Sequence, residues 1–323
     1  MIKSITIFIC LGFSLLLHAQ PENSYSIFES IETAKKTPNE VFYLQLIQQN
    51  LKDIPTEVFT FRNLKILDLS ANEFRRLPDE LTQLTDLHTL ILSENRYLDF
   101  EQITSILKRL PNLKHLTISK IQMRIVPIEL TQVTTLETLD LSSNYLEDIP
   151  FEIENLTNLH TLNLSRNRLT ALPSEIGRLS NLKTLELSFN EFEMLPLEIG
   201  NLDGLENLIL LENKLVEVPI TIGNLGDLIT LNLNSNQLKE LPETISELEK
   251  LEVLEIAANQ FTALPEDLQY LVNLKKINCY DNQLDVFPEI IVRLQKLEDI
   301  NLASNKISSV PKDIETFTFF AII

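Results

Sequence analysis

Apolar residues recur along this chain in a unit of 23 residues, with a nearly constant order of polar and apolar places. The unit that begins at Leu159 continues with Leu162, Leu164, Asn167, Leu169, Leu172 and Pro173. The leucines at the fourth and sixth places alternate with polar residues, which is the period of a β-strand with one solvated face. One unit cannot bury its leucines alone, whereas stacked units share a continuous core. The pattern therefore predicts one strand per unit and parallel pairing between successive units.

The unit occurs twelve times, and its places are numbered here from its first apolar residue. First places fall at Val41, Leu64, Leu87, Leu113, Leu136, Leu159, Leu182, Leu205, Leu228, Leu251, Leu274 and Leu297. Ten of the eleven intervals are 23 residues, and the interval from Leu87 to Leu113 is 26. This spacing resembles the leucine-rich repeat family over about Val41 to Val310. The resemblance implies an α/β fold: a leucine-rich repeat solenoid, with a curved parallel sheet on the concave face and short α or 3₁₀ turns on the convex face.

Asparagine occupies the ninth place in ten units. These residues are Asn72, Asn95, Asn144, Asn167, Asn190, Asn213, Asn236, Asn259, Asn282 and Asn305. A buried amide offers donors and an acceptor, so we expect each to satisfy backbone groups of its own coil and of the next. Proline occupies the fifteenth place in eleven units and suits the first turn of a helix. We therefore expect most coils to return through one short helical turn.

The first residues carry the features of a secretory signal peptide. Lys3 precedes an apolar run from Ile5 to Leu17, and the small residue Ala19 precedes Gln20. We expect residues 1–19 to be cleaved and the protein to be secreted or held at the cell surface or in the periplasm, with an uncleaved anchor as the alternative. The apolar run is short for a membrane span, so no membrane insertion is expected after cleavage.

The rest of the chain divides into three parts. Residues 20–40 are predicted to form an N-terminal capping helix, because Ser26 and Glu29 fit a capping box. Residues 41–311 hold the twelve leucine-rich repeats, and residues 312–323 are an apolar C-terminal partial repeat. That tail either folds over the last coil or pairs with another chain, so a homodimer through the C-terminal edge remains open.

The formal net charge is −19, and loss of Lys3 would make it −20. No basic footprint for nucleic acid exists, so no nucleic-acid partner is expected. The acidity is explained either by charges at helix starts and on solvated faces, or by attraction of a basic partner. Cleavage after Ala19 would leave Cys279 as the one cysteine, at an inward place where a thiol is expected to be inert.

Outward places on the strands are mostly Thr, Ser and Asn, with one apolar exception in two adjacent units. Phe189, Ile209 and Leu211 form this exception, bordered by Glu186 and Glu212. Apolar anchors within polar surroundings are typical of binding hot spots, so we predict partner binding there. Tyr280 is a further candidate nearer the C-terminal end. The alternative is that neighbouring side chains cover the patch.

No phosphate loop, nucleophile elbow or acid–base pair is present, so no catalytic residue, cofactor or metal is expected. His88, His115 and His160 lie near one side of the predicted sheet, but coils two apart are about 10 Å apart, which disfavours a shared metal. The region Leu87–Val126 breaks the repeat, because Ile121 replaces the expected Asn and three extra residues predict a longer helix from Glu101 to Arg109. Whether this irregularity is functional remains open.

The resemblance favours a secreted or surface-exposed bacterial protein that binds another protein through its concave face without catalysis. Similarity to secreted leucine-rich repeat proteins of bacterial pathogens implies a host protein or glycan as partner and a role in host–pathogen interaction. The alternative is an intracellular scaffold, similar to repeat adaptors that engage small GTPase-type signalling partners, whose coils share the 23-residue length and the Leu-Pro ending.

Overall fold

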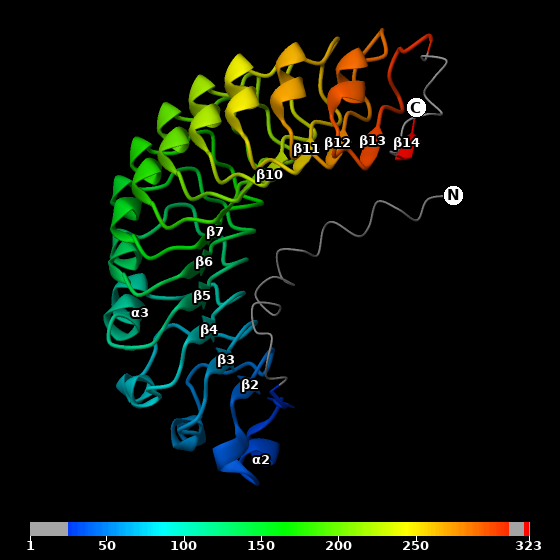
Figure 1. Ribbon diagram of the computed structural model, residues 1–323. Helices are drawn as coiled ribbons and strands as arrows, with labels where there is room; N and C mark the ends of the chain where they lie inside the picture. Colours follow the sequence, from blue (N-terminus) through cyan, green and yellow to red (C-terminus); the bar gives the residue numbers. More distant parts are fainter. Residues whose placement is uncertain (1–24, 310–319, 323) are drawn as a thin grey trace.

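The computed structural model describes residues 25–309 and 320–322. The predicted signal peptide at 1–19 and most of the partial repeat at 312–323 lie outside these residues. Within them, 14 strands form one parallel sheet in strict sequence order from β1 to β14. The strands line the inner side of an arc and the helical turns line its outer side (Figure 1). The predicted solenoid is therefore confirmed.

Each strand has only two or three residues. The strands are β1 (Ile27–Phe28), β2 (Tyr43–Gln45), β3 (Ile66–Asp68), β4 (Thr89–Ile91), β5 (His115–Thr117), β6 (Thr138–Asp140), β7 (Thr161–Asn163), β8 (Thr184–Glu186), β9 (Asn207–Ile209), β10 (Thr230–Asn232), β11 (Val253–Glu255), β12 (Lys276–Asn278), β13 (Asp299–Asn301) and β14 (Phe320–Ile322). A coil is one repeat unit, named below by its strand.

The return paths of the coils are mostly 3₁₀ turns. They are η1 (Pro38–Glu40), η2 (Thr56–Thr60), η3 (Asp79–Gln83), η4 (Ile128–Gln132), η5 (Phe151–Asn155), η6 (Ser174–Arg178), η7 (Leu197–Asn201), η8 (Ile220–Asn224), η9 (Glu243–Glu247), η10 (Glu266–Tyr270) and η11 (Glu289–Arg293). The fifteenth-place proline is the residue immediately before each turn from η2 to η11, as Pro173 is before η6. The proline backbone is extended and leads directly into the turn. Proline suits this place because no backbone N–H is needed there as a donor.

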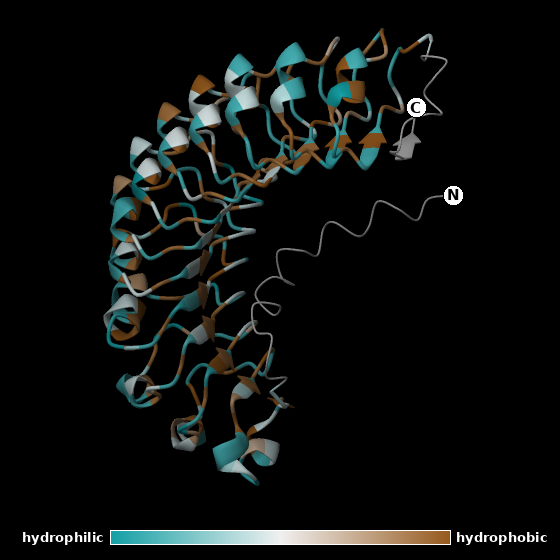
Figure 2. Ribbon diagram, in the orientation of Figure 1, coloured by the Kyte–Doolittle hydropathy of each residue, from teal (hydrophilic) through white to brown (hydrophobic). Residues whose placement is uncertain are grey.

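The core is a stack of identical inward places. Leu162 pairs with Leu139 on one side and Leu185 on the other, and all three side chains are fully buried. Burial of one such leucine contributes about 1.5–3 kcal/mol. Figure 2 shows the hydrophobic residues gathered along the strands, while the outer turns mix hydrophobic and hydrophilic residues.

The ninth-place asparagines join each coil to the one before it. The Asn190 amide nitrogen donates to Leu187 O (2.9 Å) in its own coil and to Leu164 O (3.0 Å) in the preceding coil. Its oxygen accepts from Leu169 N (3.0 Å), also in the preceding coil. The expectation that these amides reach the next coil was wrong, because the loop after the strand turns the side chain back toward the coil already formed.

The residue before each asparagine adopts a left-handed backbone. In all twelve coils the eighth-place residue has a φ between 52° and 61°, and none is glycine. Such a conformation costs about 1–2 kcal/mol for an L-residue. Two further left-handed residues, Asn50 and Gln122, lie at the tenth place of the two coils that lack the asparagine. The loop therefore needs this amide, and a coil without it bends in a different way.

The N-terminal end is closed by a strand and one helical turn. β1 pairs in parallel with β2, and α2 (Ile31–Ala34) begins after Ser30, whose hydroxyl accepts from Thr33 N (3.3 Å). The helix cap predicted at Ser26 was wrong, because the chain there is extended to pair with β2. Gln49, which replaces the asparagine of the first coil, donates through Nε2 to Glu29 O (3.2 Å) and so ties that coil to the cap.

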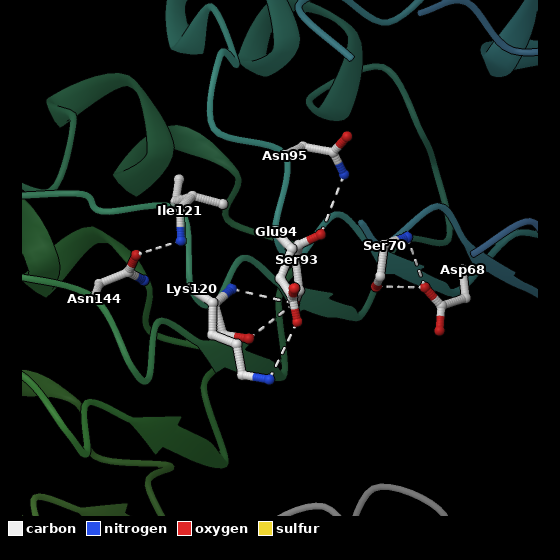
Figure 3. A network of polar contacts seen from close by, with 9 residues as sticks. Asp68, Ser70, Ser93, Glu94, Asn95, Lys120, Ile121 and Asn144 are labelled. Atoms are coloured by element: carbon white, nitrogen blue, oxygen red, sulfur yellow. Dashed lines mark hydrogen bonds and ion pairs between the residues drawn. The ribbon is translucent and has the colours of Figure 1, made fainter. Parts of the chain in front are cut away.

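The irregular coil contains α3 (Phe100–Leu107), close to the predicted helix from Glu101 to Arg109. The Gln102 amide bonds both N and O of Leu77 in the preceding coil (2.9 and 2.7 Å). Where Ile121 replaces asparagine, Lys120 pairs with Glu94 (3.1 Å) in the preceding coil (Figure 3). Asn144 of the following coil accepts from Ile121 N (3.0 Å). These contacts hold the stack together across the missing amide.

Glycines allow the outer turns to approach closely in the middle of the arc. A Cβ on Gly200 would lie 2.3 Å from Thr221 O of the next turn, and one on Gly177 would lie 2.4 Å from Glu198 O. Either contact is too short for a side chain. The turns from η6 to η9 are therefore packed against one another more tightly than a side chain at this place would permit.

At the other end, β14 pairs with β13 so that Phe320 lies opposite Asp299. This pairing joins residues 21 positions apart, whereas strands of the regular coils pair at 23. Among the described residues, no helix has the length and apolar character that crossing a membrane requires.

We predict that Asn190→Ala lowers the free energy of unfolding by about 2–4 kcal/mol, because it leaves Leu164 O and Leu169 N buried without their partner. Asn201 is an exposed asparagine in the turn η7, so Asn201→Ala is the matched control. It should change the free energy of unfolding by less than about 0.5 kcal/mol. Urea unfolding of the two variants measures the difference. Equal stability of both would contradict a structural role for the amide.

Candidate functional site

The structure brings together five of the six predicted binding residues. Ile209 lies opposite Glu186 in the paired strands β8 and β9, and Phe189 N donates to Leu211 O (2.8 Å) in the loops that follow. Glu212 comes next in the chain and is exposed. These five residues form what we call the β8–β9 patch. Tyr280 is 44% exposed but belongs to the β12 coil, so it lies apart from the patch.

The patch is partly covered by arginine. The Arg166 guanidinium lies 4.1 Å from the centre of the Phe189 ring, and Arg168 lies 4.6 Å from the ring of Tyr145. Phe189, Ile209 and Leu211 are each half-buried, and Arg166 covers the Phe189 ring. Stacking of this kind contributes about 0.5–1 kcal/mol at exposed sites. The patch is thus an apolar surface with a cationic border, not an open hydrophobic face.

The stacking of Arg166 on Phe189 and of Arg168 on Tyr145 was not predicted from the sequence. Arg166 and Phe189 share the eighth place of adjacent coils, and Tyr145 and Arg168 share the tenth. Because equal places of adjacent coils stack, the repeat register itself contains the signal. Neither guanidinium forms a hydrogen bond or ion pair within residues 25–309. Arg and Tyr are the residue types most enriched in binding hot spots.

Carboxylates at the fifth place are drawn into the sheet surface. Asp140 is 2% exposed, and its Oδ1 accepts from Ser142 N (2.8 Å). Burial raises the pKa of the Asp140 carboxyl, and the bonds from Ser142 oppose this shift. Burial likewise raises the pKa of Glu186, which accepts from Ser188 N (2.9 Å). These acids close local turns and present little charge to a partner.

The structure brings two of the three histidines into contact. His88 and His115 contact edge to face with ring centres 6.0 Å apart, and each ring bonds a threonine hydroxyl. Burial, followed by the charge of His115, lowers the pKa of His88 to about 4. No group of three or more His, Cys, Asp or Glu side chains is placed to hold a metal in residues 25–309.

Cys279 is fully buried in the core of the β12 coil, and burial raises the pKa of its thiol. A thiol in such surroundings is not a nucleophile at neutral pH.

Comparison with known proteins identifies the repeat. Residues 40–96 match the family described as "Leucine rich repeat", residues 134–177 match "Leucine Rich repeats (2 copies)" and residues 181–202 match "Leucine Rich Repeat". No curated protein matches the chain significantly in sequence.

Solved structures with a similar arrangement include proteins of bacteria and plants. A leucine-rich repeat protein of Leptospira interrogans is 27% identical, with a TM-score of 0.60, and the match covers 92% of this chain and all of that one (100%). An internalin of Listeria monocytogenes is 21% identical with a TM-score of 0.65, covering 89% of this chain and 88% of that one, and shows the fold alone.

The ectodomain of the receptor kinase GASSHO1/SCHENGEN3 of Arabidopsis thaliana is 30% identical, with a TM-score of 0.65. The match covers 86% of this chain but 37% of the receptor chain, and that structure is a complex with CASPARIAN STRIP INTEGRITY FACTOR 2. The same fold thus binds a partner molecule in a similar protein.

We predict that Asp140→Asn raises the free energy of unfolding at pH 7, because it removes a buried charge and keeps the oxygen that Ser142 N bonds. The carboxyl pKa is raised in the folded state, so its penalty is present above that pKa and is lost as pH falls toward the unfolded value of about 3.9. The stability difference should therefore shrink on acidification.

Thermal unfolding from pH 7 to pH 4 measures this difference. Asp203→Asn, at an exposed aspartate, is the control and should match the native protein. A gain for Asp140→Asn that is the same at every pH would show that the buried charge is not its cause.

Proposed function

The chain is a leucine-rich repeat protein, and from this we propose that it binds another protein through its concave face, without catalysis. The β8–β9 patch is the observation on which the proposal rests. Elsewhere on the outward face of the strands, small polar side chains predominate, whereas here an aromatic ring, two aliphatic side chains and an arginine stacked on the ring meet.

The stiffness of the arc supports this function. Parallel strands and paired asparagines fix the outward side chains before any partner arrives, so little conformational entropy is lost on binding. The border of Arg166 and Arg168 can pair with acidic groups of the partner, while Phe189, Ile209 and Leu211 can bury apolar ones. A protein surface with mixed apolar and acidic groups fits this arrangement.

We further propose that the protein is exported and that its partner is a host protein. The signal-peptide features of residues 1–19 and the likeness to a protein of Leptospira interrogans support this proposal. The competing function, a scaffold for GTPase signalling inside the cell, requires that the N-terminal segment is not used for export. Cell fractionation with N-terminal sequencing separates the two. We expect a mature chain that starts at Gln20 outside the cytoplasm, and a chain retained whole in the cytoplasm would favour the scaffold.

We predict that the double variant Ile209→Asp and Leu211→Asp captures at least about tenfold less partner, because charge replaces apolar contact at the centre of the patch. The measurement is quantitative mass spectrometry of host-surface proteins retained on immobilised residues 20–323. The melting temperature should change little, because both side chains point out of the core.

Ile66→Asp is the matched control, since Ile66 is a half-buried, outward aliphatic residue on the distant strand β3. It should leave capture unchanged. Capture that survives the double variant, or falls equally in the control, would remove the β8–β9 patch as the binding site.

A further inference from the structure

The convex side carries an apolar row that the repeat does not require. The first residues of the turns η4, η5, η7 and η8 are Ile128, Phe151, Leu197 and Ile220, with 45%, 59%, 60% and 57% of their surfaces exposed. We call these four the convex apolar row. Ser174 interrupts it at η6.

The repeat itself supplies the comparison that makes this row unusual. The same place is polar or charged in every other described turn that follows a proline: Thr56, Asp79, Glu243, Glu266 and Glu289. A polar residue at this place is therefore compatible with the coil. The large apolar side chains in the middle of the arc are not explained by folding, and exposed apolar groups of this extent mark interaction sites.

Contacts between neighbouring turns hold the two C-terminal members of the row, Leu197 and Ile220, side by side. The Thr221 hydroxyl donates to Leu197 O (2.6 Å), which holds the turns η7 and η8 together, and Gly200 permits their close approach. Ile125 and Met194 lie three residues before Ile128 and Leu197 in the chain. These two apolar residues are 70% and 56% exposed, so they extend the apolar surface. The surface thus spans five coils, interrupted at Ser174, on the side opposite to the β8–β9 patch.

Carboxylates border the row on both sides. One line follows it directly in the chain: Glu129, Glu152, Glu175 and Glu198. A second line precedes it: Glu147, Asp148, Glu193 and Glu217. None of these acids forms an ion pair within residues 25–309. The second line lies at the twelfth and thirteenth places of the coils, and in these five coils Arg124 is the one basic residue at those places. The row is therefore an apolar strip between two acidic edges.

From this arrangement we infer that the convex apolar row is a second docking surface, which takes a protein segment with an apolar stripe flanked by lysine or arginine. Apolar side chains of such a segment cover the row, and its basic residues neutralise the acidic edges. A second copy of this chain does not fit, because it would bring the same acidic edges to the contact. An anionic lipid surface is repelled for the same reason. The protein could then hold two partners at once, one on each side of the arc.

The test uses a fluorescein-labelled synthetic peptide with leucines on one helical face and lysines along both borders, and a second peptide with glutamates in place of the lysines. Fluorescence anisotropy with residues 20–323 should show at least about tenfold tighter binding of the lysine peptide. Binding should weaken with added salt, because the acidic edges contribute.

The decisive variant is Phe151→Ser with Leu197→Ser and Ile220→Ser, which places residues like Thr56 at these turns and should keep the native circular dichroism and melting curve. It should lose at least about tenfold in affinity for the lysine peptide. Glu152→Gln with Glu198→Gln should lose less affinity and reduce the salt dependence. The concave variant Ile209→Asp with Leu211→Asp should bind the peptide as the native chain does.

Three results would overturn the inference. Unchanged binding by the triple variant would mean that net charge alone attracts the peptide. A dimer in sedimentation velocity that only the triple variant abolishes would assign the row to a second copy. Binding of phosphatidylcholine vesicles that the same variant abolishes would assign it to lipid. Because the concave variant is measured in parallel, failure here leaves the proposed function separately testable.

Discussion

In ten of the twelve coils, the boundary with the preceding coil depends on an asparagine amide that serves two coils at once. The ninth-place asparagine supplies donors to carbonyls of its own coil and the preceding one, and an acceptor to a preceding N–H, as Asn190 does with Leu187, Leu164 and Leu169. These backbone groups turn inward where no strand partner exists, and burying them unpaired would cost about 1–3 kcal/mol each. The amide thus allows the chain to leave the sheet without exposing the leucine core.

The same interaction explains the backbone that precedes it. A left-handed residue precedes the ninth place in all twelve coils and directs the asparagine inward in the ten coils that have one. The fold adopts this conformation despite its cost even at a bulky residue such as Phe189. In the two coils that lack the asparagine, other contacts replace the amide. The longer side chain of Gln49 forms a hydrogen bond with the N-terminal cap. In the coil of Ile121, an ion pair between Lys120 and Glu94 joins the coil to the preceding one in place of the amide. Each of these coils carries a second left-handed residue.

Regular coils leave two surfaces free to vary. On the concave side, the fold fixes the inward leucines but not the outward places, so Ile209 and Leu211 can interrupt a polar series at no cost to the core. On the convex side, the first residue of each turn is equally free, and it is apolar only in the middle of the arc, as Phe151 and Leu197 show. The repeat therefore separates stability from recognition: one set of places packs, and another set meets partners.

The sequence by itself determined the number of coils, their register, the inward leucines and the position of the extra helix, because a period of 23 residues admits one way of stacking the apolar places. It also placed Phe189, Ile209 and Leu211 next to one another. The tertiary structure decided which coil each asparagine serves and that Arg166 covers Phe189, since both depend on the direction a side chain takes after a left-handed residue. It likewise decided that Ser26 precedes a strand, because pairing with β2 outweighs a local helix signal. Local periodicity fixes which residues stack, whereas the partners of a polar side chain are set by contacts between coils.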